Sequence, residues 1–338
     1  MVRKIDFTIH TNPLGTPDFI KTIIDDAIAR NDISTDNNEF YNLRTMIARR
    51  HGAGVQQVAI AQSAKELIFH LADSSTAKRV LLARPCPNTH AAALKHVNIT
   101  VKELSLHKKN GYRIQLDELQ DALREVDMLI MGNPAYPSGA LIPPASLIDC
   151  LSDWIIGGGW LILDESAIDF TYGSTTNSIW SAVRHEERVA IIRSFTDFLA
   201  MPLFPLNYVV GGKNWISESR SRQFSPYVAP LAGCITPALD HITPFRTATV
   251  DCVTRLMPRF LGRLRRISGI HPFPTDANWV LCHIESPIAD AVTLTQRLAM
   301  HGITIATCAD KEHFTLALKV PIETDKFIKT TRKILMPK

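Results

Sequence analysis

Short runs of apolar residues alternate with amphipathic stretches between positions 58 and 192 of the chain. Apolar runs of this length, bounded by polar or turn residues, predict buried strands, and the stretches between them show helical spacing. The predicted strands are Val58–Ala61, Val80–Ala83, Asp127–Met131, Trp160–Leu163 and Val189–Ile192, and the predicted helices are Ser63–Leu71, Thr89–His96 and Pro144–Trp154. This alternation predicts an α/β fold with a mostly parallel mixed sheet covered by helices on both faces.

The two ends of the chain follow other patterns. Asn12–Pro17 is rich in turn residues and predicts an arm, which is followed by helices at Asp18–Ala29 and Glu39–His51. Beyond position 235 a long helical stretch reaches Ile267. A smaller α+β unit then follows, with strands at Trp279–His283 and Phe314–Val320 and helices at Ala289–Met300 and Asp325–Leu335. We therefore expect an arm at 1–25, a large domain at 26–235 and a small C-terminal domain at 236–338.

Composition narrows the class of protein. With 338 residues, 46% hydrophobic and 21% charged, the chain has the balance of an ordinary globular protein. A net charge of +4 gives no reason to expect a nucleic-acid partner. No stretch approaches the roughly 20 apolar residues that span a bilayer, and the first residues lack a signal-peptide pattern, so a cytoplasmic protein is expected. The six cysteines form no CxxC pair, so no metal site is predicted.

Acidic residues follow two of the predicted strands. Asp164 and Glu165 come directly after Trp160–Leu163, and Asp197 follows Val189–Ile192 within a few residues. Ligands bind at the carboxyl ends of strands in sheets of this kind, so these side chains are expected at a ligand site. Like charges placed so close together raise the pKa of at least one member.

Seven segments occur in an order that resembles a known family. They are NPLGTP (Asn12–Pro17), FYNLRTMIARRHG (Phe40–Gly52), AQSAKELIFHLA (Ala61–Ala72), GNPAYPSG (Gly132–Gly139), LILDESAIDF (Leu161–Phe170), IIRSFTDFLAMPLFPLNYVVGG (Ile191–Gly212) and DANWVLCHI (Asp276–Ile284). Together they resemble the class I/II, fold-type I pyridoxal-phosphate aminotransferases, in the branch of histidinol-phosphate aminotransferase and threonine-phosphate decarboxylase. This resemblance implies that family's fold, with a large and a small domain, and a homodimer with its sites at the subunit interface.

The resemblance also implies a lysine that forms a Schiff base with pyridoxal phosphate. Its position in RSFT-x is occupied by Asp197. A carboxylate cannot form an imine, so covalent attachment of the cofactor is not expected. Noncovalent binding of pyridoxal phosphate or its amine form, pyridoxamine phosphate, stays open because Asp164 matches the partner of the pyridine nitrogen.

Other family positions have also changed. The resemblance places the phosphate-binding arginine at Pro205, the tyrosine at the cofactor phenolic oxygen at Ala167, the signature asparagine at Tyr136, the stacking aromatic near Pro87, the substrate-carboxylate arginine at Thr315 and the neighbouring subunit's tyrosine at Thr35. Lys319 lies four residues beyond Thr315. The predicted catalytic residues are Asp164, Asp197 and Tyr136, and the predicted ligand-binding residues of the former cofactor pocket are Ser63, Ala64, Lys65, His90, Asn133, Ser194 and Thr196.

Three functional hypotheses follow. The first is a repurposed biosynthetic enzyme that binds a small amino-acid-derived or phosphorylated metabolite without covalent pyridoxal phosphate. The second is a noncatalytic pseudoenzyme that partners an active paralogue of the same pathway. The third is a pyridoxal-phosphate enzyme that uses another lysine, for which Lys65 and Lys213 are the candidates. A Cys86–His90 nucleophile lacks an evident orienting group, and His70 is expected to pack on a helix.

Overall fold

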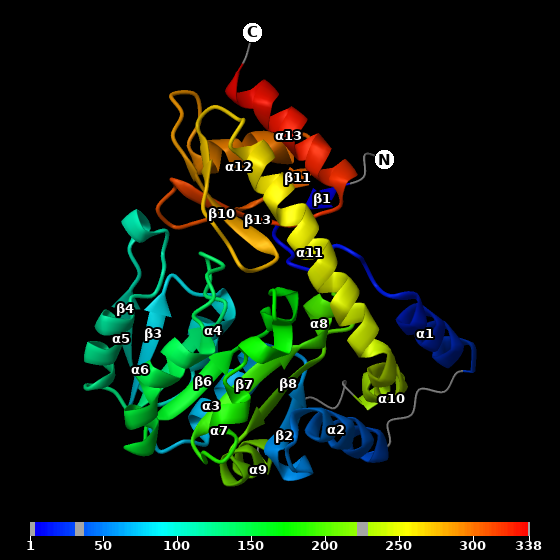
Figure 1. The fold of residues 1–338 in the computed structure, drawn as a ribbon, viewed down its shortest axis with the longest axis vertical. Coiled ribbons are helices and arrows are strands. Elements are labelled where there is room, and N and C mark those ends of the chain that lie inside the picture. The colour runs from blue at the N-terminus through cyan, green and yellow to red at the C-terminus, as the bar shows by residue number, and fades with distance from the viewer. Residues whose placement is uncertain (1–3, 31–36, 222–228, 337–338) are drawn as a thin grey trace.

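The computed structural model describes residues 4–30, 37–221 and 229–336, and its larger part is built on a seven-stranded sheet (Figure 1). The strand order is β2-β8-β7-β6-β5-β3-β4. Strand β8 is antiparallel to both its neighbours, whereas the other pairings are parallel, so the sheet is mixed as predicted. The strands are β2 (Val58–Ala61), β3 (Arg79–Arg84), β4 (Thr100–Ser105), β5 (Met128–Gly132), β6 (Trp160–Asp164), β7 (Val189–Ser194) and β8 (Asn207–Gly211).

Helices cover both faces of this sheet because successive strand residues point to opposite sides. On β6, Leu161 and Leu163 pack with one group of helices, whereas Ile162 packs with the other. The first group comprises α2 (Asn37–His51), α5 (Leu116–Leu123), α6 (Pro144–Ile156) and α7 (Trp180–Val183). The second group comprises α3 (Ala64–Asp73), α4 (Asn88–Leu94) and α9 (Lys213–Ser221).

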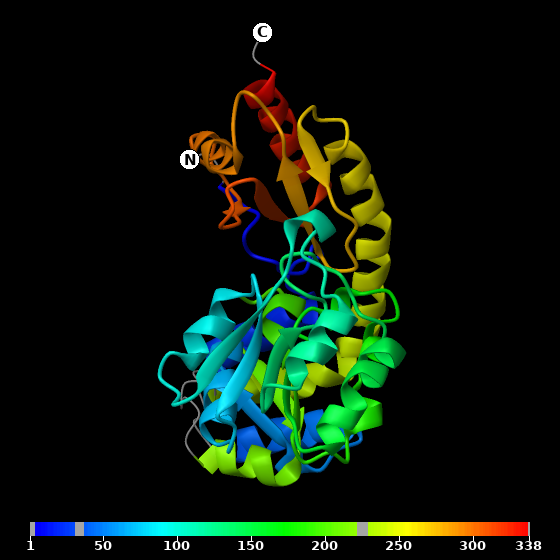
Figure 2. The same cartoon turned by 90° about the vertical axis from the view of Figure 1, so that its left-hand side faces the viewer.

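A second, smaller unit lies above the large sheet (Figures 1 and 2). Its antiparallel sheet has the order β12-β13-β10-β9. These strands are β9 (Ile270–Pro272), β10 (Trp279–Ile284), β12 (Ala306–Thr307) and β13 (His313–Ala317), with helices α12 (Ala291–Ala299) and α13 (Pro321–Leu335). The N-terminal strand β1 (Ile5–Asp6) joins this unit by pairing in parallel with β11 (Ile303–Thr304).

The remaining helices connect and flank the two units. Figure 1 shows α11 running from the large unit up to the small one. These connecting and flanking helices are α1 (Asp18–Arg30), α8 (Phe195–Phe198), α10 (Ala229–Ala238) and α11 (Ile242–Leu264). Short 3-10 turns lie at Val55–Gln57, Lys108–Asn110, Ile168–Phe170, Ser174–Asn177 and Leu239–His241. None of the described helices is both long and apolar enough to cross a membrane.

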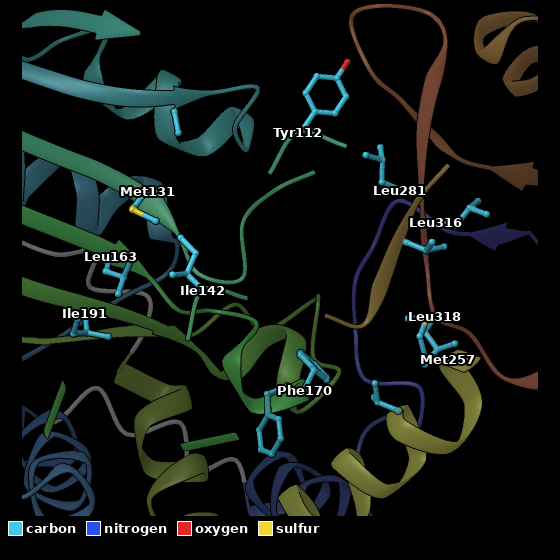
Figure 3. Close-up of a cluster of buried hydrophobic side chains, with 14 of the residues drawn as sticks. Tyr112, Met131, Ile142, Leu163, Phe170, Ile191, Met257, Leu281, Leu316 and Leu318 are labelled. Carbon is cyan, nitrogen blue, oxygen red and sulfur yellow. The ribbon is translucent and has the colours of Figure 1, made fainter. Parts of the chain in front are cut away.

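One continuous cluster of buried apolar side chains spans the two units. Figure 3 shows Leu163 and Ile191 on the large sheet and Leu281 and Leu316 on the small sheet, all members of that cluster. Phe7 adds to it from the arm, because its ring lies 5.1 Å from that of Phe327. The apolar packing therefore fixes how the small unit sits above the strand ends.

The predicted elements agree with the structure in kind and differ at some boundaries. Val58–Ala61 is a strand over the predicted residues, but β4 at Thr100–Ser105 was missed because this edge strand is half polar. The helical stretch that was predicted to run unbroken to Ile267 is interrupted by the 3-10 turn at Leu239–His241. The last helix begins at Pro321 rather than Asp325, since proline suits the first helical turn.

A buried ion-pair network ties the sheet to α11. Arg193 on β7 is 2% exposed, and its Nη2 lies 2.9 Å from Glu165 Oε2, at the end of β6. Arg193 Nη1 lies 3.6 Å from Asp169 Oδ2, and Arg246 on α11 donates from Nε to Asp169 Oδ1 at 2.7 Å. Burial raises the pKa of Glu165 even though Arg193 opposes that shift. The network therefore holds two charges of each sign among β6, β7 and α11.

Removing Arg193 is expected to weaken the fold strongly. The substitution Arg193→Met leaves Glu165 and Asp169 buried with less compensation, which costs about 3–5 kcal/mol of unfolding free energy. Urea denaturation followed by circular dichroism measures this change. Lys21→Met is the control, because the Lys21–Asp18 pair is exposed and its loss is expected to leave the urea midpoint nearly unchanged. Equal midpoints for the two variants would contradict a stabilising network.

Candidate functional site

A cavity of about 390 Å³ lies at the carboxyl ends of β2, β5, β6 and β7. The small unit and the arm close it through Trp279, Asn278 and His10. Of the residues predicted for the site, those lining this cavity are Asp164, Asp197, Tyr136, Ser63, Ala64, His90, Ser194 and Thr196. The parallel strand arrangement thus brings together side chains that are more than one hundred positions apart in sequence.

Asp164 ends β6 and is held firmly. His90 Nε2 lies 2.8 Å from its Oδ2, and its Oδ1 accepts hydrogen bonds from the backbone nitrogen and the hydroxyl of Ser166 at 3.0 and 2.5 Å. Burial acts to raise the pKa of Asp164, but these hydrogen bonds and His90 outweigh it, so the pKa lies below its ordinary value. Asp164 is therefore an ionised, oriented carboxylate at neutral pH.

Asp197 lies in the short helix α8, which Ser194 caps by accepting from the Asp197 backbone nitrogen. The Asp197 side chain lines the cavity, and its carboxylate accepts no hydrogen bond from the described residues. Burial and the negative charge of Asp164 raise its pKa to about 6, against the opposing effect of Lys319. The pKa of Asp197 therefore lies above its ordinary value whereas that of Asp164 lies below, and the sequence predicted that at least one of these pKa values would be raised.

Glu165 does not join these two carboxylates, although the sequence placed it beside Asp164. It points away into the core and pairs with Arg193. Neighbouring residues on an extended strand face opposite sides, so the Asp164 side chain faces the cavity and Glu165 cannot. The site contains two aspartates rather than three carboxylates.

An aromatic wall closes the cavity on the side of the small unit. The His10 and Trp279 rings stack with centroids 4.8 Å apart, and the Tyr136 ring lies 6.5 Å from His10. Burial and Lys319 lower the pKa of His10 to about 4, so the ring is neutral at pH 7. His10 Nε2 and Asn278 Oδ1 are buried with no hydrogen-bond partner among the described residues.

Two predicted ligand-binding residues lie elsewhere. Lys65 has an exposed side chain and does not line the cavity. Asn133 is fully buried, and its amide bonds to the backbone of Ile142, which donates its N–H to Oδ1 at 2.8 Å and accepts from Nδ2 at 3.0 Å. These hydrogen bonds shape the loop after β5, and Asn133 does not line the cavity.

Two of the predicted ligand-binding hydroxyls accept hydrogen bonds from the backbone. Ser63 caps α3 by accepting from Glu66 N at 3.2 Å, and Thr196 Oγ1 accepts from Leu206 N at 2.8 Å. Position 205, between these segments, is a proline that lines the cavity and offers no N–H.

Three further interpretations of the sequence concern the Cys86–His90 pair, the substrate-carboxylate position at Thr315 with nearby Lys319, and the neighbouring subunit's tyrosine position at Thr35. Burial raises the pKa of Cys86 above its ordinary value, and His90 Nε2 is directed to Asp164, so the Cys86–His90 nucleophile is not supported. Thr315 is fully buried on β13, and the amine of Lys319 donates to Ile9 O at 2.8 Å. Thr35 lies outside the described residues.

His10 and Asn278 were missed as site residues. Each is an isolated polar residue in a local sequence with no catalytic pattern, and their proximity depends on the arm reaching the small unit. Asn278 Nδ2 donates to His10 O at 2.5 Å across 268 positions of sequence. Asn278 and Trp279 both lie in the Asp276–Ile284 segment, which indicated the start of the small domain but gave no sign of a contact with His10.

Comparison with known proteins now places the chain. The family model described as aminotransferase class I and II matches residues 2–309. The chain belongs to the class I and II aminotransferase family. Threonine-phosphate decarboxylase of Salmonella typhimurium is 25% identical over 98% of this chain and 91% of its own length. Histidinol-phosphate aminotransferase of Desulfitobacterium hafniense is 24% identical over 96% and 90%.

Solved structures of this aminotransferase family share the fold. The histidinol-phosphate aminotransferase of Clostridium acetobutylicum superposes with a TM-score of 0.87 at 23% identity, covering 98% of each chain. The L-threonine-O-3-phosphate decarboxylase of Porphyromonas gingivalis gives a TM-score of 0.81 at 17% identity, covering 98% of this chain and 99% of its own. These likenesses establish the fold-type I architecture with its smaller C-terminal domain.

The cavity of this aminotransferase-family chain can be tested against pyridoxal phosphate. Imine formation requires an amine, and a phosphate group calls for cationic or unpaired donors. Among the described residues that line the cavity there is neither a lysine nor an arginine. Asp164 fits as a partner for a pyridine nitrogen, and the lining hydroxyls and the N-terminal turn of α3 offer neutral hydrogen-bond donors. The described lining therefore does not fit a covalently attached cofactor, and it offers no lysine or arginine to a phosphate.

Asp197 is expected to lower stability at neutral pH. Its folded pKa of about 6 exceeds the reference value of 3.8, so the folded state loses stability as pH rises through this range. Asp197→Asn should therefore raise the unfolding free energy by roughly 1–3 kcal/mol near pH 7.5, with the gain vanishing near pH 4. Urea unfolding across this pH range measures it. Asp18→Asn, on an exposed residue, is the control, and an Asp197→Asn variant less stable than wild type at pH 7.5 would refute the prediction.

Proposed function

We propose that the chain is a repurposed biosynthetic enzyme that acts on a small amino-acid-derived metabolite without covalent pyridoxal phosphate. The observation that carries this proposal is Asp197, a carboxylate free of hydrogen bonds in a cavity whose described lining has no lysine. The relatives named for threonine phosphate and histidinol phosphate support a substrate derived from an amino acid.

The two aspartates supply acid–base chemistry to this proposed enzyme. A pKa of about 6 allows Asp197 to accept and release a proton near neutral pH, whereas Asp164 stays ionised and fixed by His90. Paired carboxylates with separated pKa values suit distinct roles in one reaction. In this proposal Asp197 exchanges the proton, Asp164 orients or stabilises positive charge, and Tyr136 contacts the ligand.

Reaction with the cofactor and borohydride tests the absence of a Schiff base. The purified chain is incubated with pyridoxal phosphate, reduced with borohydride and mapped by peptide mass spectrometry. We expect no single lysine to be labelled stoichiometrically, because the lysines proposed as substitutes, Lys65 and Lys213, are exposed and lie outside the described cavity lining. Stoichiometric labelling of one lysine would establish a relocated Schiff base and contradict the proposal.

The same experiment leaves noncovalent binding measurable. Titration of unreduced protein with pyridoxal phosphate or pyridoxamine phosphate, followed by absorbance, reports whether Asp164 alone retains either molecule. The pseudoenzyme alternative predicts instead that Asp164→Asn and Asp197→Asn leave every assigned activity unchanged and that an active paralogue co-purifies from the native host.

We further propose that the chain forms a homodimer around this cavity. Tyr172 and Leu203 are 83% and 85% exposed, and each follows or precedes a cavity-lining residue within two positions. Exposed apolar side chains beside a site are typical of an interface.

Charge insertion tests this interface. Leu203→Glu is expected to shift the chain from dimer to monomer in analytical ultracentrifugation, because a carboxylate cannot be buried unpaired between subunits. Met300→Glu is the matched control, since Met300 is 84% exposed and lies on the small unit after α12. A monomeric wild type, or a Leu203→Glu variant that remains dimeric, would contradict the proposed interface.

A further inference from the structure

The charge of the cavity points to the ligand class. Asp164 and Asp197 both line it, and its described lining carries no arginine or lysine. The nearby amine of Lys319 is directed to Ile9 O and does not line the cavity. An anion entering this space would meet two carboxylates and, in the described lining, no lysine or arginine. The N-terminal turn of α3 offers only partial positive charge against the two carboxylates, so phosphates and carboxylates are disfavoured.

The unpaired polar atoms of the lining point the same way. The Asp197 carboxylate accepts no hydrogen bond from the described residues, and Asn278 Oδ1 is buried without a partner. Both are acceptors. A buried acceptor that receives no hydrogen bond costs about 1–3 kcal/mol, so a ligand that donates hydrogen bonds is favoured.

The apolar part of the wall suits a ligand with a compact body. Tyr136, Phe170, Trp279 and the neutral His10 present rings or ring edges to the cavity. Aromatic faces attract ammonium groups, and their area packs an apolar frame. The cavity volume of about 390 Å³ lies within the range of small-molecule sites.

We propose that the cavity binds a primary amine that carries no phosphate, with its ammonium group on Asp197 and its apolar body against the aromatic wall. This inference rests on the proposed function and names its substrate class. The ammonium group supplies the positive charge that the described lining lacks, and its N–H groups meet the free acceptors. The metabolite that binds is therefore an amine rather than a phosphate ester.

Three molecules of one shape test the charge preference. Benzylamine, benzyl alcohol and benzoate are titrated into the full chain by isothermal calorimetry at pH 7.5. We expect benzylamine to bind at least about tenfold more tightly than benzyl alcohol, because a charge-assisted hydrogen bond to a carboxylate exceeds a neutral one. Benzoate is expected to show no measurable binding, and inorganic phosphate is expected to show none.

Matched substitutions assign the effect to one residue. Asp197→Asn should remove the preference for benzylamine over benzyl alcohol while leaving the binding of the alcohol nearly unchanged. Asp18→Asn makes the same chemical change on a fully exposed side chain and should leave all three affinities unaltered. The unfolding midpoint of each variant shows that it remains folded.

The pH dependence supplies an independent readout. Asp164 and Lys319 act on the charge of Asp197, and the other titratable groups of the cavity lining are His10, His90 and Tyr136. Benzylamine stays protonated between about pH 5 and 8. Its affinity should fall several-fold as pH drops through about 6, where Asp197 gains a proton, and Asp197→Asn should flatten this profile.

The outcomes separate the two proposals. Tighter binding of benzoate or phosphate than of benzylamine, no binding of benzylamine at all, or an Asp197→Asn variant with wild-type preference would each overturn the amine site. These results would leave the lack of a Schiff base untouched, because borohydride labelling reports that separately. A labelled lysine would overturn the proposed function even if benzylamine bound.

Discussion

The buried ion pairs of Arg193 hold together the strand ends that line the cavity. Arg193 lies on β7, inside the sheet between β8 and β6, and pairs with Glu165 at the end of β6, while Asp169 pairs with both Arg193 and Arg246 of α11. Because the charges are buried, none of them can move to water without leaving a partner uncompensated. The network therefore fixes the ends of β6 and β7, which place Asp164 and Asp197 on the wall of one cavity.

That placement has a thermodynamic consequence. Asp164 has His90 and Ser166 as partners, so its ionisation agrees with the fold. Asp197 has none among the described residues, and burial beside Asp164 raises its pKa to about 6. A buried carboxylate that destabilises the fold in its ionised form is typical of functional residues. A bound cation would stabilise the ionised form of Asp197.

The sequence predicted the core better than the site. Apolar alternation determines the strands, and Asp164 and Asp197 follow them, so the two key carboxylates could be located. The spacing of apolar residues did not predict that Glu165 points into the core and pairs with Arg193. It also did not predict that Asn133 donates to the backbone oxygen of Ile142. His10 and Asn278 could not be found at all, because their contact joins opposite ends of the chain and leaves no local pattern.

The positions of the departures from the family pattern explain how membership of the family is compatible with the chemistry that we propose. The apolar clusters on both faces of the sheet depend on strand and helix interiors, whereas the cavity is lined by residues at strand ends and in loops. Substitution at such positions alters charge without disturbing core packing. Pro205, Ala167 and Asp197 all line this one cavity, so the changes act on a single ligand. In the proposed function, Asp197 at the lysine position and Pro205 at the arginine position leave the described lining without a cation, which favours a positively charged ligand in the same space.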